Sequence, residues 1–285
     1  MENMNEKITV SQVVEALEEL APPALAMEWD NPGLQVGRRD SEVKRVYVAL
    51  DVTDAVLRAA FEACCDMIVT HHPLIFGKID KVNDGDHIGR WILMMAEEGI
   101  ACYAMHTNFD IAPGCMADLC ATRLGLEKAS PLEETGTASR VSILDGELQE
   151  EETETIGIGK IGRFEDETLT VRELAERVKD AFDLPFVTVY SDDPDRQAGW
   201  IAMCPGSAKG MLDQTLAAGC DVLIGGDLGH HDGIDAVAEG VSLINAGHYG
   251  LEHVFIDAAA DYLESRFGGK IAVVRAPVVF PEELV

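Results

Sequence analysis

The chain has 285 residues, which is enough for one large α/β domain or for two small ones. Its composition, 47% hydrophobic and 26% charged, is typical of globular proteins, and no apolar run reaches the length of a membrane-spanning helix. The formal net charge of -29 repels phosphate backbones and anionic lipids, which argues against nucleic-acid and membrane binding.

Apolar spacing predicts alternating helices and strands in the N-terminal part of the chain. Thr9 and Gln12 form a capping-box pattern, and Pro22-Pro23 ends the helix that follows. We expect helix, strand, helix, strand, helix, strand and helix at about residues 9–21, 46–50, 53–64, 67–69, 88–98, 101–105 and 116–124. This alternation predicts a largely parallel sheet flanked by helices, whose ligands bind at the carboxyl ends of the strands.

The C-terminal part repeats this plan. Residues 46–72 resemble residues 199–227, and Cys65 follows Ala49 at the same spacing, 16 residues, as Cys220 follows Cys204. Residues 99–110 similarly resemble residues 240–253. A true duplication and independent strand–helix–strand units both remain open. In the first case, pseudo-twofold packing would direct the carboxyl ends of both sets of strands into one cleft.

Histidines are concentrated where strands end. Seven of the eight lie in or beside four clusters, and the eighth, His87, stands alone at a polar helix start. The clusters are His71/His72, His106/Asp110, His230/His231 and His248/Glu252, with His253 beside the last. Clustering at the ligand-binding edge of a sheet favours a functional site over isolated core or surface histidines.

His248 and Glu252 are four residues apart, so a helix places both side chains on one side. Gly247 permits a tight turn into that helix, and a helix N-terminus disfavours imidazolium, which keeps His248 neutral and able to bind a metal. Asp110 would add a carboxylate from the other half of the chain. His71 and the following His72 could each face a different ion if the chain turns at the proline after them.

Three imidazoles and two carboxylates exceed the needs of one tetrahedral site with an open position. They suit two ions about 3.5–4 Å apart, joined by a bridging carboxylate. Mixed nitrogen and oxygen ligands favour Zn²⁺, Fe²⁺, Mn²⁺ or Co²⁺ over Ca²⁺ and discriminate weakly among them.

The motifs WDNPGLQVG, VALDVT, DMIVTHHPLIF, HTNFD and GHYGLEHV occur in this order over nearly the whole chain. In this set the sequence resembles the Nif-three-like dinuclear-metal-centre family, many of whose members are named GTP cyclohydrolase 1 type 2 homolog. The resemblance implies a two-lobed α/β fold, a homohexameric toroid whose metal sites open to an inner cavity, and two divalent ions per chain. The metal ligands it implies are His71, His72, Asp110, His248 and Glu252, with Glu252 as the bridge.

The resemblance also places His106 beside the metals and gives His230 and His231 no ligand role. We expect these two at the surface or behind the ligands, and a place in the lining of the cavity remains open. Some members carry a large extra domain between the halves, whereas here the short gap predicts at most a loop and a helix. The acidic run Glu147–Glu154 is expected as a solvated loop. The run GIGKIG at 157–162 fits a dinucleotide motif, but no helix follows directly, so a turn between short strands is expected.

We therefore predict two related α/β lobes with a pseudo-twofold internal repeat, mixed or parallel sheets flanked by helices, and a metal site in the cleft between them. The predicted N-terminal lobe covers residues 1–129 and the connecting segment, with short strands and a helix from about residue 171, covers 130–195. The C-terminal lobe at 196–285 would complete the metal site.

The N-terminal stretch has no signal-peptide core, and most of the seven cysteines lie in apolar runs without a Cys-x-x-Cys pair, so we expect buried free thiols and a cytoplasmic location. These expected buried thiols are Cys64, Cys65, Cys102, Cys204 and Cys220.

The predicted function is a metal-dependent hydrolase resembling GTP cyclohydrolase 1 type 2. Two ions would lower the pKa of a water molecule and stabilise an oxyanion, and His106 or a nearby carboxylate would carry the proton. The family name implies GTP as substrate, with ring opening at C8 and loss of formate. No guanine-reading acid or basic triphosphate clamp is evident, so a phosphoester hydrolase remains open. The alternatives are a non-catalytic metal-binding, chaperone or regulatory protein, and an interaction scaffold.

Overall fold

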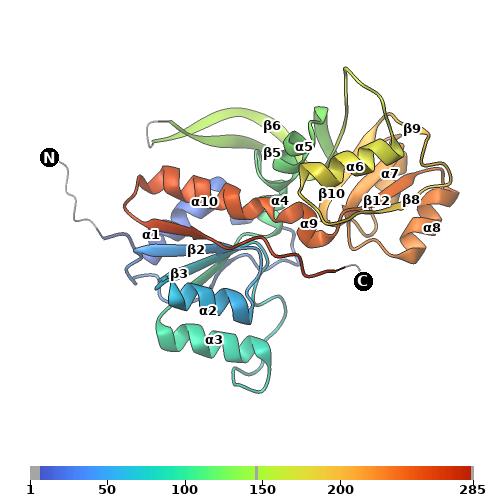
Figure 1. The fold of residues 1–285 in the computed structure, drawn as a ribbon. Helices are drawn as coiled ribbons and strands as arrows, with labels where there is room; N and C mark the ends of the chain where they lie inside the picture. The colour runs from blue at the N-terminus through green and yellow to red at the C-terminus, as the bar shows by residue number, and fades with distance from the viewer. Residues whose placement is uncertain (1–6, 145–146, 284–285) are drawn as a thin grey trace. The chain divides into compact units, whose positions relative to one another are not determined.

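The structure, a computed structural model, describes residues 7–144 and 147–283 (Figure 1). Contacts group the chain into two compact units. Unit 1 consists of Met1–Phe109, Val141–Glu151 and Phe255–Pro277, and unit 2 consists of Asp110–Arg140, Glu152–Val254 and Val278–Val285. The predicted lobe boundaries after residues 129 and 195 stay a prediction.

Unit 1 contains a five-stranded sheet in the order β1-β4-β3-β2-β13. The strands are β1 (Gly33–Val36), β2 (Arg45–Ala49), β3 (Met67–Thr70), β4 (Ala101–Ala104) and β13 (Ala272–Arg275). Neighbours from β4 to β13 pair in parallel, and β1 pairs antiparallel to β4. All residues of β3 and β4 are buried, as expected for parallel strands covered on both faces. The predicted α/β class is therefore confirmed.

Helices cover both faces of this sheet (Figure 1). They are α1 (Val10–Leu20), the 3-10 helix η1 (Pro23–Leu25), α2 (Asp54–Glu62), α3 (His87–Glu98), α4 (Thr107–Ile111) and α10 (Val254–Phe267). The predicted capping box of Thr9 and Gln12 starts α1. On the same face, the Tyr262 hydroxyl of α10 donates to the Ala16 carbonyl of α1 at 2.8 Å. α2 and α3 lie on the opposite face.

Unit 2 contains a six-stranded sheet in the order β5-β6-β10-β11-β12-β8. The strands are β5 (Glu127–Leu144), β6 (Glu147–Arg163), β8 (Thr188–Tyr190), β10 (Ile201–Ser207), β11 (Val222–Gly226) and β12 (Ser242–Asn245), and β7 (Leu169–Thr170) pairs separately with β9 (Gln197–Ala198). The central β10, β11 and β12 are parallel, and β6 and β8 pair antiparallel at their flanks. The helices are α5 (Met116–Leu124), α6 (Val171–Ala181), α7 (Leu212–Ala217), α8 (His230–Ala238) and α9 (His248–Glu252).

The segment at 130–195 differs from the expected loop and helix. The acidic run expected as a solvated loop belongs to β6, and so does the GIGKIG run expected as a turn. Cross-strand pairing explains the difference, because Arg140 of β5 contacts Glu154 of β6 at 3.3 Å and the hydroxyls of Ser139 and Thr153 lie 3.1 Å apart. The predicted helix is present as α6, which begins with a capping box at Thr170.

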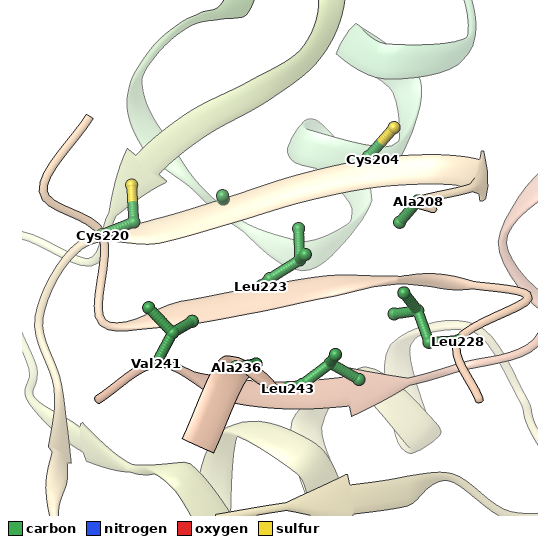
Figure 2. Packing of buried hydrophobic residues seen from close by; sticks show 9 residues of the cluster. Cys204, Ala208, Cys220, Leu223, Leu228, Ala236, Val241 and Leu243 are labelled. Atoms are coloured by element: carbon green, nitrogen blue, oxygen red, sulfur yellow. The ribbon is translucent and has the colours of Figure 1, made fainter. Parts of the chain in front are cut away.

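An apolar cluster holds the three parallel strands of unit 2 together (Figure 2). Leu223 of β11 and Leu243 of β12 belong to it with Cys204 of β10, and each of the three is at most 3% exposed. Burial of a leucine side chain contributes about 1.5–3 kcal/mol to folding. The cluster thereby packs the three strands against one another, and the candidate site of unit 2 begins beyond their carboxyl ends.

All seven cysteines are free, and six are buried. Cys64 is exposed, which corrects the expectation of a buried thiol. It follows the last turn of α2, where the backbone takes a φ of 52° and turns the side chain outward from the apolar face of the helix. Among the residues that the structure describes, no helix is both long enough and apolar enough to cross a membrane.

Candidate metal centre

Three histidines of unit 1 meet at the carboxyl edge of its sheet. His71 and His72 follow β3, and His106 follows the neighbouring parallel strand β4. One ligand nitrogen from each of the three rings lies within 4.8 Å of the other two. His71 is fully buried, and His72 and His106 are partly buried. Strand pairing therefore brings together two sequence clusters more than thirty residues apart.

Each of these imidazoles is held through its Nδ1 atom. The acceptors, each 2.7 Å away, are the Met105 carbonyl for His71, Asp51 Oδ1 for His72 and Asp30 Oδ1 for His106. An acceptor at Nδ1 places the ring proton on that nitrogen and leaves a lone pair on Nε2. This arrangement, with a carboxylate or carbonyl behind each ring, is the usual way in which proteins orient histidine ligands.

Asp30 is the most constrained of these acceptors, since its side chain is 0% exposed. Its carboxylate accepts hydrogen bonds from His106 Nδ1, from the Thr107 backbone N–H and from the Thr107 hydroxyl. Burial acts to raise the pKa of Asp30, but the hydrogen bonds from His106 and Thr107 outweigh it and bring the pKa to about 2. Asp30 is therefore ionised at neutral pH and accepts the His106 Nδ1–H as a carboxylate.

Unit 2 presents a second donor group on α9. His248 Nε2 lies 3.0 Å from Glu252 Oε2, and His248 Nδ1 lies 3.0 Å from Asp227 Oδ2. Two ligands of one tetrahedral zinc ion, each about 2.05 Å from the metal, lie about 3.3 Å apart. The His248 and Glu252 donor atoms are thus spaced much as one ion requires. Gly247, at a φ of 78°, makes the predicted turn into the helix.

Gly206 makes room for the Glu252 carboxylate. A Cβ atom on Gly206 would lie 2.2 Å from Glu252 Oε1 and 3.6 Å from His248 Nε2, and the residue has a φ of 72°. A Cβ atom on Gly226 would lie 2.5 Å from the His248 backbone nitrogen. The glycines that end β10 and β11 therefore form a cradle for α9 that any side chain would fill.

Asp110 and Glu252 both raise the pKa of the same two buried thiols. Burial raises the pKa of the Cys204 thiol to about 12, and the negative charges of Asp110 and Glu252 add to the effect. Burial also holds the pKa of Cys120 well above its usual value, again with contributions from both carboxylates. Asp110 and Glu252 thus both lie close enough to Cys204 and Cys120 to raise the pKa of these buried thiols.

The remaining histidines lie apart from these groups. His230 and His231 begin α8 and are exposed, as the expected surface position requires, with their ring centroids 5.3 Å apart. His253 is buried and its Nδ1 atom lies 2.9 Å from the Gly250 carbonyl. His87 packs its ring against Trp91 at 4.9 Å. The structure gives none of these four a place among the donor groups of the described residues.

Sequence reasoning missed the three aspartates behind the rings. Asp51 comes two residues after β2, Asp227 follows β11 directly, and Asp30 lies in the turn-rich segment before β1. Their positions at the ends of strands and in a turn were a usable signal, because the predicted histidines lie at the same edges. Their partners depend on strand order, which the spacing of apolar residues does not reveal.

Imidazole and carboxylate donors with oriented tautomers fit Zn²⁺, Fe²⁺, Mn²⁺ or Co²⁺. The expectation that the chain carries histidine and glutamate groups able to bind metal is confirmed. The number of ions, their identity and the assignment of the five predicted ligands stay predictions.

The sequence and the fold of this chain resemble those of known proteins. A family model described as Duf34/NIF3 (NGG1p interacting factor 3) matches residues 8–279. The GTP cyclohydrolase 1 type 2 homolog of Streptococcus pneumoniae is 32% identical over 256 residues, which cover 89% of each chain. The Clostridium acetobutylicum protein of the same name is 31% identical over 245 residues, which cover 86% of this chain and 85% of that one. The crystal structure of Staphylococcus aureus hypothetical protein SA1388 superposes with a TM-score of 0.84 at 28% identity, covering 98% of this chain and all of that one.

Proposed function

Because the chain belongs to the Duf34/NIF3 family, we propose that it binds two divalent ions and acts as a metal-dependent hydrolase resembling GTP cyclohydrolase 1 type 2. The observation that carries the proposal is the orientation of every candidate imidazole ligand through Nδ1. Such second contacts are the usual way in which proteins orient histidine ligands of a metal.

The proposed ligands come from both units. Unit 1 would contribute His71 and His72, and unit 2 would contribute Asp110, His248 and Glu252. Glu252 is the proposed bridge, since its side chain is 3% exposed and its Oε1 atom has room only because position 206 is glycine. Zinc, iron, manganese and cobalt all fit this mixture of nitrogen and oxygen donors.

Bound divalent ions would lower the pKa of a water molecule and stabilise negative charge that develops on the substrate. His106 is the proposed proton carrier. Its Nδ1–H donates to Asp30, so Nε2 is free of the ring proton and can accept one from water or substrate. The imidazolium that results is stabilised by the Asp30 carboxylate, whose pKa of about 2 keeps it ionised.

We also propose that the two units are related lobes of an internal repeat, with the metal site in the cleft between them. One detail supports the repeat. Asp66 Oδ2 accepts the backbone N–H groups of residues 44 and 45 at 2.7 and 2.9 Å, and Asp221 Oδ2 accepts those of 199 and 200 at 3.0 and 2.9 Å. Donors and acceptors of the two sets are related by the same shift of 155 residues (221 − 66 and 199 − 44).

From the family resemblance we further propose a homohexameric toroid and a cytoplasmic location. Sedimentation or light scattering gives the mass in solution, and about six times the chain mass of 30.9 kDa is expected. A monomeric mass would contradict the toroid, whatever the metal content.

The test of the function begins with metal content. After loading with Fe²⁺, Zn²⁺ or Mn²⁺, elemental analysis should find about two ions per chain in the wild type. His72→Ala and Glu252→Ala should reduce this number, whereas His231→Ala, which changes an exposed histidine outside the donor groups, should not. Fewer than about one ion in the loaded wild type would refute the dinuclear site.

Turnover is then measured on nucleotides and phosphoesters with the loaded proteins. His106→Ala should keep its metal and lose activity, which distinguishes a proton carrier from a third imidazole ligand. If no substrate is turned over by fully loaded wild type, the chain is a metal-binding or regulatory protein instead of a hydrolase.

A further inference from the structure

We infer that Trp29 and Phe76 form a stacking site beside His106 that selects substrates with a planar aromatic ring, of the nucleobase type. The inference rests on the proposed function and assigns the residues that would bind the ring of its substrate. The two aromatic residues and His106 all belong to unit 1.

The rings of Trp29, Phe76 and His106 are steeply inclined to one another, and together they form a corner. The Trp29 and Phe76 centroids are 5.9 Å apart at an interplanar angle of 63°, and each ring lies close to His106, at 6.1 Å and 73° for Trp29 and at 5.9 Å and 83° for Phe76. No two of these rings stack face to face. Ring faces therefore stay available to a flat ligand, which could stack on one wall while its edge meets another.

Both aromatic side chains are unusually exposed, at 59% for Trp29 and 57% for Phe76. Single apolar side chains are common at protein surfaces, whereas several that gather in one place mark an interaction site. Among the described residues of unit 1, the exposed large hydrophobics are Trp29, Phe76, Ile79 and Val82. All four lie on the segment before β1 or on the loop after the histidine pair, so this exposure is concentrated beside the candidate site.

Polar side chains hold the corner in place. Asn31 donates to the Ile75 carbonyl at 2.6 Å, and the Ile75 N–H donates to Gln35 at 3.2 Å, which ties the segment after Trp29 to the residue before Phe76. Asp30, next to Trp29, accepts a hydrogen bond from His106 Nδ1 and so holds the third ring of the corner. The backbone that carries the two aromatic side chains is thus held in place before any ligand arrives, which lowers the entropic cost of binding.

The loop that carries Phe76 also lines a hollow of about 550 Å³. Its volume falls within the range of about 300–1,000 Å³ that is usual for small-molecule sites. Its charged lining residues are Lys78, Asp80, Lys81 and Asp86, so both signs of charge are present. A ligand whose ring stacks in the corner could place a polar substituent in this hollow.

The inference is tested by binding, separately from turnover. Calorimetry on metal-loaded protein would measure the affinity for the four common nucleoside monophosphates and for ribose 5-phosphate, which has the phosphate without the ring. Trp29→Ala and Phe76→Ala should weaken the best nucleotide by about 10- to 100-fold, the usual effect of losing one stacking partner. Trp29→Phe, which keeps an aromatic ring, should restore most of that affinity.

Val82→Ala is the matched control, since it shortens an exposed side chain of the same loop that has no aromatic ring. It should leave nucleotide binding unchanged, and no variant should change the affinity for ribose 5-phosphate or the metal content. Alanine variants that bind nucleotides as the wild type does, or a wild type that binds none of them, would overturn the inference. A change in the mass of the oligomer in Trp29→Ala and Phe76→Ala would also overturn it and assign the patch to contacts between copies. A wild type that binds nucleotides through these rings without turnover would contradict only the hydrolase proposal.

Discussion

Gly206→Ala is expected to weaken metal binding far more than it weakens the fold. The new Cβ atom would lie 2.2 Å from Glu252 Oε1, so the carboxylate must retreat by about 1.2 Å to reach the 3.4 Å of ordinary contact (3.4 − 2.2). Metal–ligand distances tolerate only about 0.2 Å, so Glu252 would no longer bind at its place. We expect metal affinity to fall by about 100-fold, which corresponds to about 2.8 kcal/mol.

The effect on folding should be smaller, because Glu252 can move its carboxylate without moving the backbone. An alanine at a φ of 72° destabilises the folded chain by about 1–2 kcal/mol. The same substitution reduces the conformational freedom of the unfolded chain, which offsets about half of that loss. Gly210→Ala is the matched control, since this residue has a φ of 81° and no atom within 4 Å of the added Cβ. Both variants should therefore lose a similar free energy of unfolding in the absence of metal.

Urea denaturation of the metal-free proteins would measure the folding term. Competition with a chromophoric chelator would measure the affinity for Zn²⁺. The reasoning is refuted if Gly206→Ala binds Zn²⁺ as tightly as the wild type, or if Gly210→Ala binds it equally weakly.

Three further predictions follow from the same geometry. Asp51→Asn removes the carboxylate that orients His72 and should weaken Zn²⁺ binding by about 10- to 100-fold at an unchanged melting temperature; an unchanged affinity would show that the contact does not serve the metal. The pKa of Asp30 is lowered from 3.8 to about 2, so its contribution is fully present above pH 4 and metal-free protein should lose about 2 kcal/mol of unfolding free energy between pH 4 and pH 2. Urea titrations of wild type and Asp30→Asn would isolate this loss, and parallel pH profiles of the two proteins would contradict it. At pH 8, a thiol reagent should modify only Cys64 rapidly in the native protein, because burial raises the pKa of Cys65 and Cys220 to about 11 and of Cys102 and Cys204 to about 12. Rapid reaction of more than one thiol per chain before unfolding would refute that assignment.

Part of the candidate site could be predicted from the sequence, because it depends on residues that are close together in the chain. The spacing of His248 and Glu252 places both on one side of a helix, and the structure has that helix with the donor atoms 3.0 Å apart. The capping box at Thr9 and the apolar run before His71 likewise depend on residues within a few positions of each other. For such features the interaction partner is fixed by the backbone geometry of a single element, so the order of the residues is enough.

Other features depended on how distant segments pair. The charge of the acidic stretch in β6 predicts a loop. It is a strand instead, because β5 supplies hydrogen-bond partners and Arg140 supplies an opposite charge to Glu154. Cys64 reads as buried by its apolar neighbours, yet the backbone at the end of α2 turns it outward. Propensity and burial at these positions are decided by neighbours that the local sequence does not contain.

The sequence by itself determined that the candidate histidines lie at the carboxyl ends of strands and which of them share a helix with a carboxylate. Only the tertiary structure decided what holds them, since Asp30 is 76 positions from His106, and Asp51 is 21 positions from His72. It also decided that Trp29 and Phe76 stand exposed beside the same histidine. The physical reason is that hydrophobic periodicity fixes the inward face of each element, whereas the partner of a polar side chain follows from strand order and loop closure, which only the folded chain establishes.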